Sequence, residues 1–179
     1  TNLQVLALSP TIVEAVKTAN QKNRSLTEEE ILAYDKAWTD KSPNAEPLVQ
    51  SIQQNATSEH LRRFIKNFPE EVEVFVTDER GLNVAMTERT SDYLQADESW
   101  WKSAYYAGQG TTFVGNVSYD ETAKTYAMNI GVPIRDETGA LIGILRGTVN
   151  VSALFDALSK ISLGETGDAI LLDLSLIHI

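Results

Sequence analysis

The spacing of apolar residues changes at Pro69, and this change constrains the fold more than any other feature of the chain. Before it, apolar residues recur at intervals of three and four, as on the buried face of a helix, and Thr27–Glu30 has the pattern of a helix start. After it, Val72, Val74 and Val76 occupy every second position, which is typical of a β-strand. The sequence therefore predicts a helical segment followed by a sheet.

Further strands are expected from similar apolar runs. Two strands, 72–77 and 82–87, flank the turn-forming run TDERG and are expected to form a hairpin, and later strands are expected at 112–119, 126–134 and 141–151. Short connections cannot accommodate the crossover that parallel strands need, so antiparallel pairing is expected. The predicted fold class is α+β, with an antiparallel sheet of about five to six strands and long N-terminal helices packed on one face. The segment 91–107 is expected to cover the other face.

Local signals predict where helices begin and end. Ser9 is expected to cap a helix that restarts at Pro10. Another helix is expected to follow Ser58 and to end before Pro69. A last helix is expected over 152–160.

Net charge and cysteine content exclude several classes of function. The chain of 179 residues has a formal net charge of -10, which argues against nucleic acid as a partner because phosphates would be repelled. It contains no cysteine, so it has neither a catalytic thiol nor a disulfide. Its two histidines, His60 and His178, lack the serine and aspartate pattern of nucleophilic catalysis. We therefore predict no catalytic residue, no metal site and no cofactor.

Residues 91–106, SDYLQADESWWKSAYY, are rich in aromatic and acidic side chains. Adjacent residues on a helix point about 100° apart, so Trp100 and Trp101 are not expected to enter one core together. We expect one of them to pack and the other to line a cavity or lie on the surface. The stretch is interpreted as the wall of a small-molecule pocket, and the alternative is a helix that covers the sheet with bulky side chains.

Several runs, in their order along the chain, resemble a known family. VFVTDERGLNVAMTE is followed by ADESWWKSAY, by a strand ending in Tyr119-Asp120, by IGVPI and by GALIGILRGTVNVSAL. Over about residues 1–162 the chain resembles the membrane-distal module of a double Cache domain. This domain is the extracellular sensor of chemoreceptors, sensor histidine kinases and cyclic-dinucleotide enzymes. The resemblance implies a PAS-like sheet.

The resemblance also implies three segments. An N-terminal helical segment spans 1–70, and a PAS-like ligand-binding module spans 71–162. Residues 163–179 are interpreted as the truncated start of a second, membrane-proximal module, because the run GETGDAILLD is similar to the first strand of that module. Residues 174–179 depart from the family pattern, and we expect them not to be native family sequence.

The best-known subgroup of the family binds amino acids, and its pattern locates candidate ligand contacts. In that subgroup an arginine binds the ligand carboxylate and an aspartate binds the ammonium group. The corresponding residues here are Glu98 and Asn150, so an amino acid held in the usual way is not expected. The predicted ligand-binding residues are Tyr93, Glu98, Trp100, Trp101, Tyr119, Tyr126, Arg146 and Asn150.

Three interpretations of this set are open. In the first, Glu98 pairs with a cationic ligand such as an amine, and Tyr93 and the Trp100–Trp101 pair supply cation–π contacts. In the second, Arg146 binds an anion, because strand alternation places it on the same face as Asn150. In the third, Arg146 and Glu98 form an ion pair that closes an empty pocket, and the module serves structure or dimerisation only.

The function implied by the resemblance is non-enzymatic. The chain would be an extracytoplasmic domain, periplasmic or extracellular, of a cell-membrane receptor with a cytoplasmic output domain. It would bind a small polar metabolite between the sheet and the aromatic segment, and a homodimer would use the N-terminal helix. An alanine in place of Trp101 is expected to abolish the response to ligand and to leave the fold intact.

Overall fold

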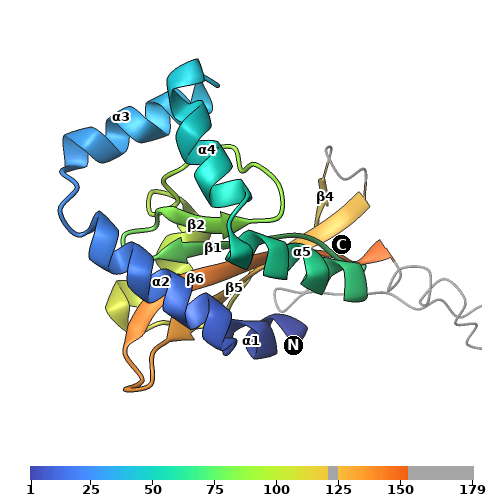
Figure 1. The fold of residues 1–179 in the computed structure, drawn as a ribbon. Helices are drawn as coiled ribbons and strands as arrows, with labels where there is room; N and C mark the ends of the chain where they lie inside the picture. The colour runs from blue at the N-terminus through green and yellow to red at the C-terminus, as the bar shows by residue number, and fades with distance from the viewer. Residues whose placement is uncertain (121–124, 153–179) are drawn as a thin grey trace, which may run out of the picture.

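The computed structural model describes residues 1–120 and 125–152, and its helices and strands follow in the predicted order (Figure 1). The N-terminal helices are α1 (Asn2–Ala7), α2 (Pro10–Asn23), α3 (Glu28–Thr39), α4 (Glu46–Gln53) and α5 (Ala56–Asn67), with a 3-10 turn η1 (Pro43–Ala45) before α4. The remaining elements are β1 (Glu71–Asp78), β2 (Asn83–Met86), α6 (Ser99–Tyr105), a 3-10 turn η2 (Tyr106–Gly108), β3 (Phe113–Val114), β4 (Ser118–Asp120), β5 (Thr125–Arg135) and β6 (Leu141–Asn150).

The strands form one antiparallel sheet, as the short connections predicted. Its order is β2-β1-β6-β5-β3, and β4 also pairs with β5. Strand β6 is bonded to β1 on one side and to β5 on the other, so it is central. The α+β class and the antiparallel sheet are confirmed, with six strands in the described part of the chain.

Capping side chains decide where the helices begin. Thr27 Oγ1 accepts the backbone N–H of Glu30, and the Glu30 carboxylate accepts the backbone N–H of Thr27, which is the predicted reciprocal cap. The predicted restart after Ser9 is confirmed by α2. Helix α5 begins ahead of the predicted Ser58, because Asn55 Oδ1 accepts the Ser58 N–H at 2.8 Å and caps the helix there.

Two predicted elements are shorter than expected. The predicted strand 112–119 is divided into β3 and β4, which pair with different parts of β5. Of the segment 91–107, residues 91–98 precede α6 as a loop. Asp35 Oδ1 of α3 accepts the backbone N–H groups of Tyr93 (2.9 Å) and Leu94 (2.8 Å). Because these N–H groups bond to a side chain of another helix, the backbone turns helical only afterwards.

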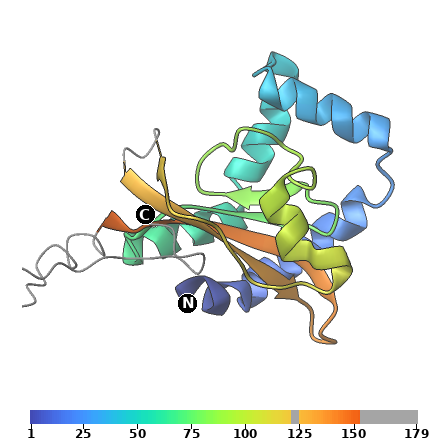
Figure 2. The ribbon, with the colours of Figure 1, turned by 180° about the vertical axis from the view of Figure 1, so that it is seen from behind.

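The sheet separates two hydrophobic cores. On one face, in front in Figure 1, α1, α2 and α5 pack on the strands through side chains such as Leu3 and Leu61. On the other face α6 lies across the sheet (Figure 2), where Trp100 packs against Phe75. Helices α3 and α4 extend beyond the β2 edge and contribute to this second core, with Trp38 fully buried in it. The two-face prediction is confirmed for α1, α2 and α5 on one face and α6 on the other, whereas α3 and α4 do not join the other N-terminal helices.

Two further findings concern the limits of the described chain. Among residues 1–120 and 125–152, no helix has the length and apolar character needed to cross a membrane. The predicted helix 152–160, from residue 153 onward, and the predicted second-module segment 163–179 lie outside the described residues.

Glu71 places a carboxyl group inside the contact between α1 and the sheet. The residue is 5% exposed, and its Oε2 has no hydrogen-bond partner within the described part of the chain. Oε2 lies beside Gly147 of β6, where a Cβ would meet it at 3.1 Å and would meet Leu3 of α1 at 2.5 Å. Burial, reinforced by the charge of Glu70, raises the pKa of Glu71 to about 7. The folded state therefore favours the neutral carboxyl.

Replacement of Glu71 by glutamine is expected to stabilise the protein above pH 7. Folding raises the pKa of this carboxyl above its ordinary value of 4.5, so the stabilisation that it gives at low pH is lost as the pH rises through about 7. Glutamine stays neutral, so the free energy of unfolding at pH 8 should rise by about 1–3 kcal/mol.

Urea denaturation at pH 5 and pH 8 measures this effect. The matched control is Glu88→Gln at an exposed position, which should keep the pH dependence of the wild type. A Glu71→Gln protein that loses as much stability between pH 5 and pH 8 as the wild type does would contradict the prediction.

Candidate ligand-binding cleft

A cleft of about 390 Å³ lies between the start of α6 and the sheet. The loop before α6 and the helix itself form one wall, and β5 and β6 form the other. The cleft is lined largely by polar side chains, and its residues are Ser91, Gln95, Glu98, Ser99, Trp100, Phe113, Gly115, Asn116, Asn129 and Arg146. A concave site with several polar groups is the usual form of a small-molecule site.

Two aromatic rings hold Arg146 at the wall of this cleft. Its Cζ lies 5.2 Å from the ring centroid of Phe75 and 5.3 Å from that of Trp100. Phe75 is its register partner on β1, and the rings of Phe75 and Trp100 meet edge to face at 5.7 Å. Cation–π attraction to both rings fixes the guanidinium in position before any ligand arrives.

Asn129 of β5 adds a fixed amide to the same wall. It is the register partner of Thr148, which lies two residues beyond Arg146 and therefore on the same face of β6. Thr148 Oγ1 donates to Asn129 Oδ1 at 2.9 Å, so the amide oxygen is used within the sheet. The Asn129 amide nitrogen is thereby left as a donor for another acceptor. Arg146 and Asn129 together present hydrogen-bond donors to the cleft.

Glu98 lines the cleft from the opposite wall. It occupies the N-cap position of α6 in extended conformation, is exposed, and makes no capping hydrogen bond with its side chain. One acidic and one basic group thus face the same cleft, and the Arg146–Glu98 pair that closes the pocket stays a prediction.

A polar network holds the loop that carries Gln95 into the cleft. Gln95 is buried, and its Nε2 donates to the carboxylate of Asp92 and, at 3.1 Å, to the Asp92 carbonyl oxygen. Burial raises the pKa of Asp92. Asp35 Oδ1 accepts the backbone N–H groups of the next two residues of the loop, Tyr93 and Leu94. The lining contributed by this loop is thus preorganised by hydrogen bonds rather than by helix geometry.

Both adjacent tryptophans pack in the second core, which is contrary to the expectation that they would not enter one core together. Trp100 is 8% exposed and Trp101 is 6% exposed. Trp101 donates its indole N–H to Thr77 Oγ1 at 3.0 Å and stacks on Tyr105 with ring centroids 4.5 Å apart. Helix α6 lies flat on the sheet and contacts it along one line. Two adjacent side chains, about 100° apart, can therefore both pack against the sheet, one on each side of that line. Only Trp100 lines the cleft.

The structure places Tyr93 away from the cleft as well. It is 3% exposed and packs in the second core, 5.6 Å from Trp38 and 6.4 Å from Tyr34 between ring centroids. Its position in the sequence matched the family pattern, but the loop around it turns the ring toward α3. Tyr93 and Trp101 therefore belong to the supporting core beneath α6 and its preceding loop.

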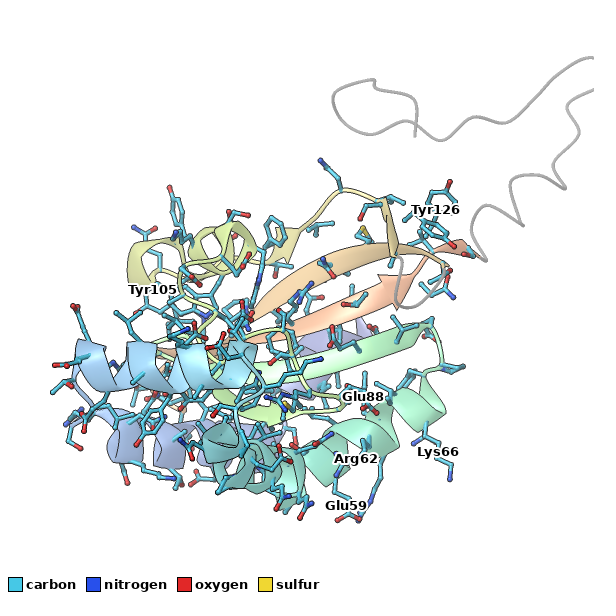
Figure 3. The ribbon with its side chains drawn as sticks, turned by 90° about the horizontal axis from the view of Figure 1, so that it is seen from above. Glu59, Arg62, Lys66, Glu88, Tyr105 and Tyr126 are labelled. Atoms are coloured by element: carbon cyan, nitrogen blue, oxygen red, sulfur yellow. The ribbon has the colours of Figure 1, made fainter. Side chains whose placement is uncertain are left out.

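The last three predicted residues gather at the far end of the sheet. Tyr119 and Tyr126 form an edge-to-face pair at 5.4 Å, and Asn150 Oδ1 accepts from Thr125 Oγ1 at 2.8 Å. In Figure 3, Tyr126 and the α6 residue Tyr105 are labelled at opposite ends of the molecule. Of the eight predicted residues, the structure brings together three in the cleft, Glu98, Trp100 and Arg146.

Several lining residues had no signal in the sequence. Gln95 and Asn116 lie in loops, and their positions depend on contacts distant in the chain. Asn129 could have been predicted, because the register of β5 against β6 places it on the same sheet face as Arg146.

A comparison with models of protein families shows to which family the chain belongs. The family model dCache_1, described as a Cache domain, matches residues 7–175. The chain belongs to the Cache domain family. A comparison with curated proteins returns no match.

Solved Cache-like sensor domains share the fold. The sensory domain of the Campylobacter jejuni chemoreceptor Tlp3 (CcmL) is 16% identical with a TM-score of 0.53, over 94% of this chain and 69% of that one. The ligand-binding domain of the Pseudomonas aeruginosa amino acid chemoreceptor PctC, in complex with GABA, is 17% identical with a TM-score of 0.52, over 84% and 73%. The sensor domain of the V. cholerae histidine kinase DctB is 12% identical with a TM-score of 0.51, over 85% and 47%. The chain thus spans about half of the DctB sensor domain.

The described residues of this Cache domain contain no cluster of three or more histidine, cysteine, aspartate or glutamate side chains that could hold a metal ion. The polar groups that line the cleft are amides, hydroxyls and the guanidinium of Arg146, together with the carboxylate of Glu98, which can only accept when ionised. This set suits a small organic ligand with charged and hydrogen-bonding groups.

Replacement of Trp101 by alanine is expected to unfold or strongly destabilise the domain, because the ring is buried and its N–H is bonded to Thr77. Loss of a buried tryptophan costs about 3–5 kcal/mol. This outcome replaces the expectation of an intact fold. Urea denaturation measures the loss, and Tyr119→Ala, at a site 48% exposed, is the control that should change stability little. A Trp101→Ala protein with wild-type stability would refute the packing described here.

Proposed function

We propose that this chain is the extracytoplasmic ligand-binding sensor module of a transmembrane signalling receptor, and that it acts by binding rather than by catalysis. Membership of the Cache family supports a sensor role. The similar fold of histidine kinase and chemoreceptor sensor domains supports a receptor context. We expect the parent protein to be membrane-anchored with a cytoplasmic output domain, and a homodimer through the N-terminal helix stays a prediction.

We further propose that the ligand is a small polar metabolite whose carboxylate binds Arg146. The observation that carries this proposal is the guanidinium held between Phe75 and Trp100 at the wall of a polar cleft. Arginine binds carboxylates through paired, charge-assisted hydrogen bonds, and a side chain already held in place loses little entropy on binding. The amide of Asn129 on the neighbouring strand supplies a further donor.

The geometry does not favour a cationic ligand held by aromatic rings. A cation–π site needs ring faces that are open to the ligand. The ring of Trp100 already has the Arg146 guanidinium over it, at 5.3 Å. Trp101 and Tyr93 are buried in the core and are not among the residues that line the cleft. The anionic alternative through Arg146 is therefore better supported than the aromatic cage for an amine.

Glu98 adds a preference about the rest of the ligand. Its carboxylate lines the same cleft as Arg146. A ligand with an ammonium group as well as a carboxylate satisfies both charges, whereas a second carboxylate near Glu98 would be repelled. We propose that the cleft prefers such zwitterions to dicarboxylates.

The test compares ligands that share a carbon skeleton. Thermal-shift and calorimetric titrations use ω-amino acids from glycine to 6-aminohexanoate, together with the carboxylic acids and the amines of the same lengths. The wild type is expected to bind one or more carboxylates, and the ω-amino acid of that length more tightly. Arg146→Gln should weaken binding of both by about tenfold or more, because a charge-assisted hydrogen bond is lost.

Glu98→Gln is the matched variant on the other wall. It should remove the advantage of the amino acid over the plain carboxylic acid and leave the affinity for the carboxylic acid unchanged or improved. Binding of amines alone, or carboxylate binding that survives in Arg146→Gln, would contradict the assignment of Arg146.

A further inference from the structure

A second concave surface lies on another part of the molecule. It is a groove of about 580 Å³ between α2 on one side and α4, the first turn of α5 and β2 on the other. Its lining shares no residue with the cleft around Arg146. The walls include Ala15 and Ala19 of α2, Ile52 of α4 and Val84 of β2, so the groove is mainly apolar. Small side chains on α2 leave the space open.

Asn83 lines this groove and carries an unsatisfied acceptor. The residue is 2% exposed, and its Oδ1 has no hydrogen-bond partner among residues 1–120 and 125–152. The orientation of the amide is fixed, because its Nδ2 donates to Thr90 Oγ1 at 2.7 Å and to the Asp92 carbonyl oxygen at 2.8 Å. A carbonyl oxygen can only accept, so a rotated amide would lose this bond without gaining a donor for Oδ1.

The other amides that line the groove have partners. Asn23 Nδ2 donates to Asp78 Oδ2 at 2.8 Å. Asn55 Nδ2 donates to the Val84 carbonyl oxygen at 2.9 Å. The groove therefore combines apolar walls with the unmet acceptor of Asn83. A buried acceptor without a donor costs free energy, and a donor brought by a ligand recovers it.

We infer that this groove is a second small-molecule site, which takes a compact and mainly apolar molecule with one N–H or O–H donor for Asn83 Oδ1. The inference goes beyond the sensor function proposed above, because neither Arg146 nor Glu98 takes part. The volume falls within the range of about 300–1,000 Å³ that is usual for ligand pockets. The acceptor of Asn83 disfavours carboxylates, which have no donor when ionised.

The two sites border the same loop, so the test must distinguish them. Asn83 Nδ2 donates to the carbonyl oxygen of Asp92. Gln95, which lines the cleft, donates its Nε2 N–H to the same oxygen. Arg146→Gln alters the cleft and leaves the groove unchanged. It therefore serves as the variant that separates failure of one site from failure of the other.

The test uses indole as the probe and 1-methylindole as its match without the N–H. Isothermal titration calorimetry on the full chain is expected to show indole bound about tenfold more tightly than 1-methylindole, because only indole donates to Asn83 Oδ1. Ala15→Phe fills the groove from α2 and should abolish binding of both probes. Ala33→Phe, at an exposed alanine of α3, and Arg146→Gln should both bind indole as the wild type does.

Four results would overturn the inference. They are no measurable binding of indole, equal binding of the two probes, indole binding that survives in Ala15→Phe, and indole binding that is lost in Arg146→Gln. Sedimentation of the wild type and of Ala15→Phe adds a further check. Self-association that Ala15→Phe abolishes would assign the groove to a second copy of the chain and overturn the small-molecule site.

Discussion

The central position of β6 is the constraint on which the rest of this Cache domain depends. Hydrogen bonds to β1 and β5 on its two sides hold it along most of its length, and its side chains alternate between two cores. Arg146 faces the cleft under α6, whereas Gly147, the next residue, lies against Leu3 of α1. One strand thus separates the candidate ligand site from the N-terminal helices by a single layer of backbone, so a shift of β6 at one face is felt at the other.

The aromatic clamp on Arg146 links packing to chemistry. Phe75 and Trp100 belong to the second core, and the same rings hold the guanidinium at the cleft wall. The bulky residues that appeared to form a ligand cage therefore support a positive charge that belongs to the protein. The aromatic stretch first indicated a cationic ligand. Because the guanidinium of Arg146 already lies over the ring of Trp100, the structure favours an anionic ligand group instead.

Much of the fold was predictable because its signals are local. The change of period at Pro69, the reciprocal cap at Thr27 and the short connections between strands each act over a few residues, and each was confirmed. The site was less predictable. Tyr93 fits the family spacing, yet Asp35, a residue distant in the chain, bonds to the loop and directs its ring into the core. Spacing along the chain does not report such contacts.

By itself the sequence determined the class of the fold, the family, and the presence of one arginine on the central strand. These follow from apolar periodicity and from short-range motifs, which need no knowledge of neighbours. Only the tertiary structure decided which side chains share the cleft. The flat packing of α6 buries both Trp100 and Trp101, and the length of the sheet separates Tyr126 from Tyr105 of the same helix (Figure 3). A binding site is assembled from distant segments, so its membership is decided by packing and strand register rather than by any local pattern.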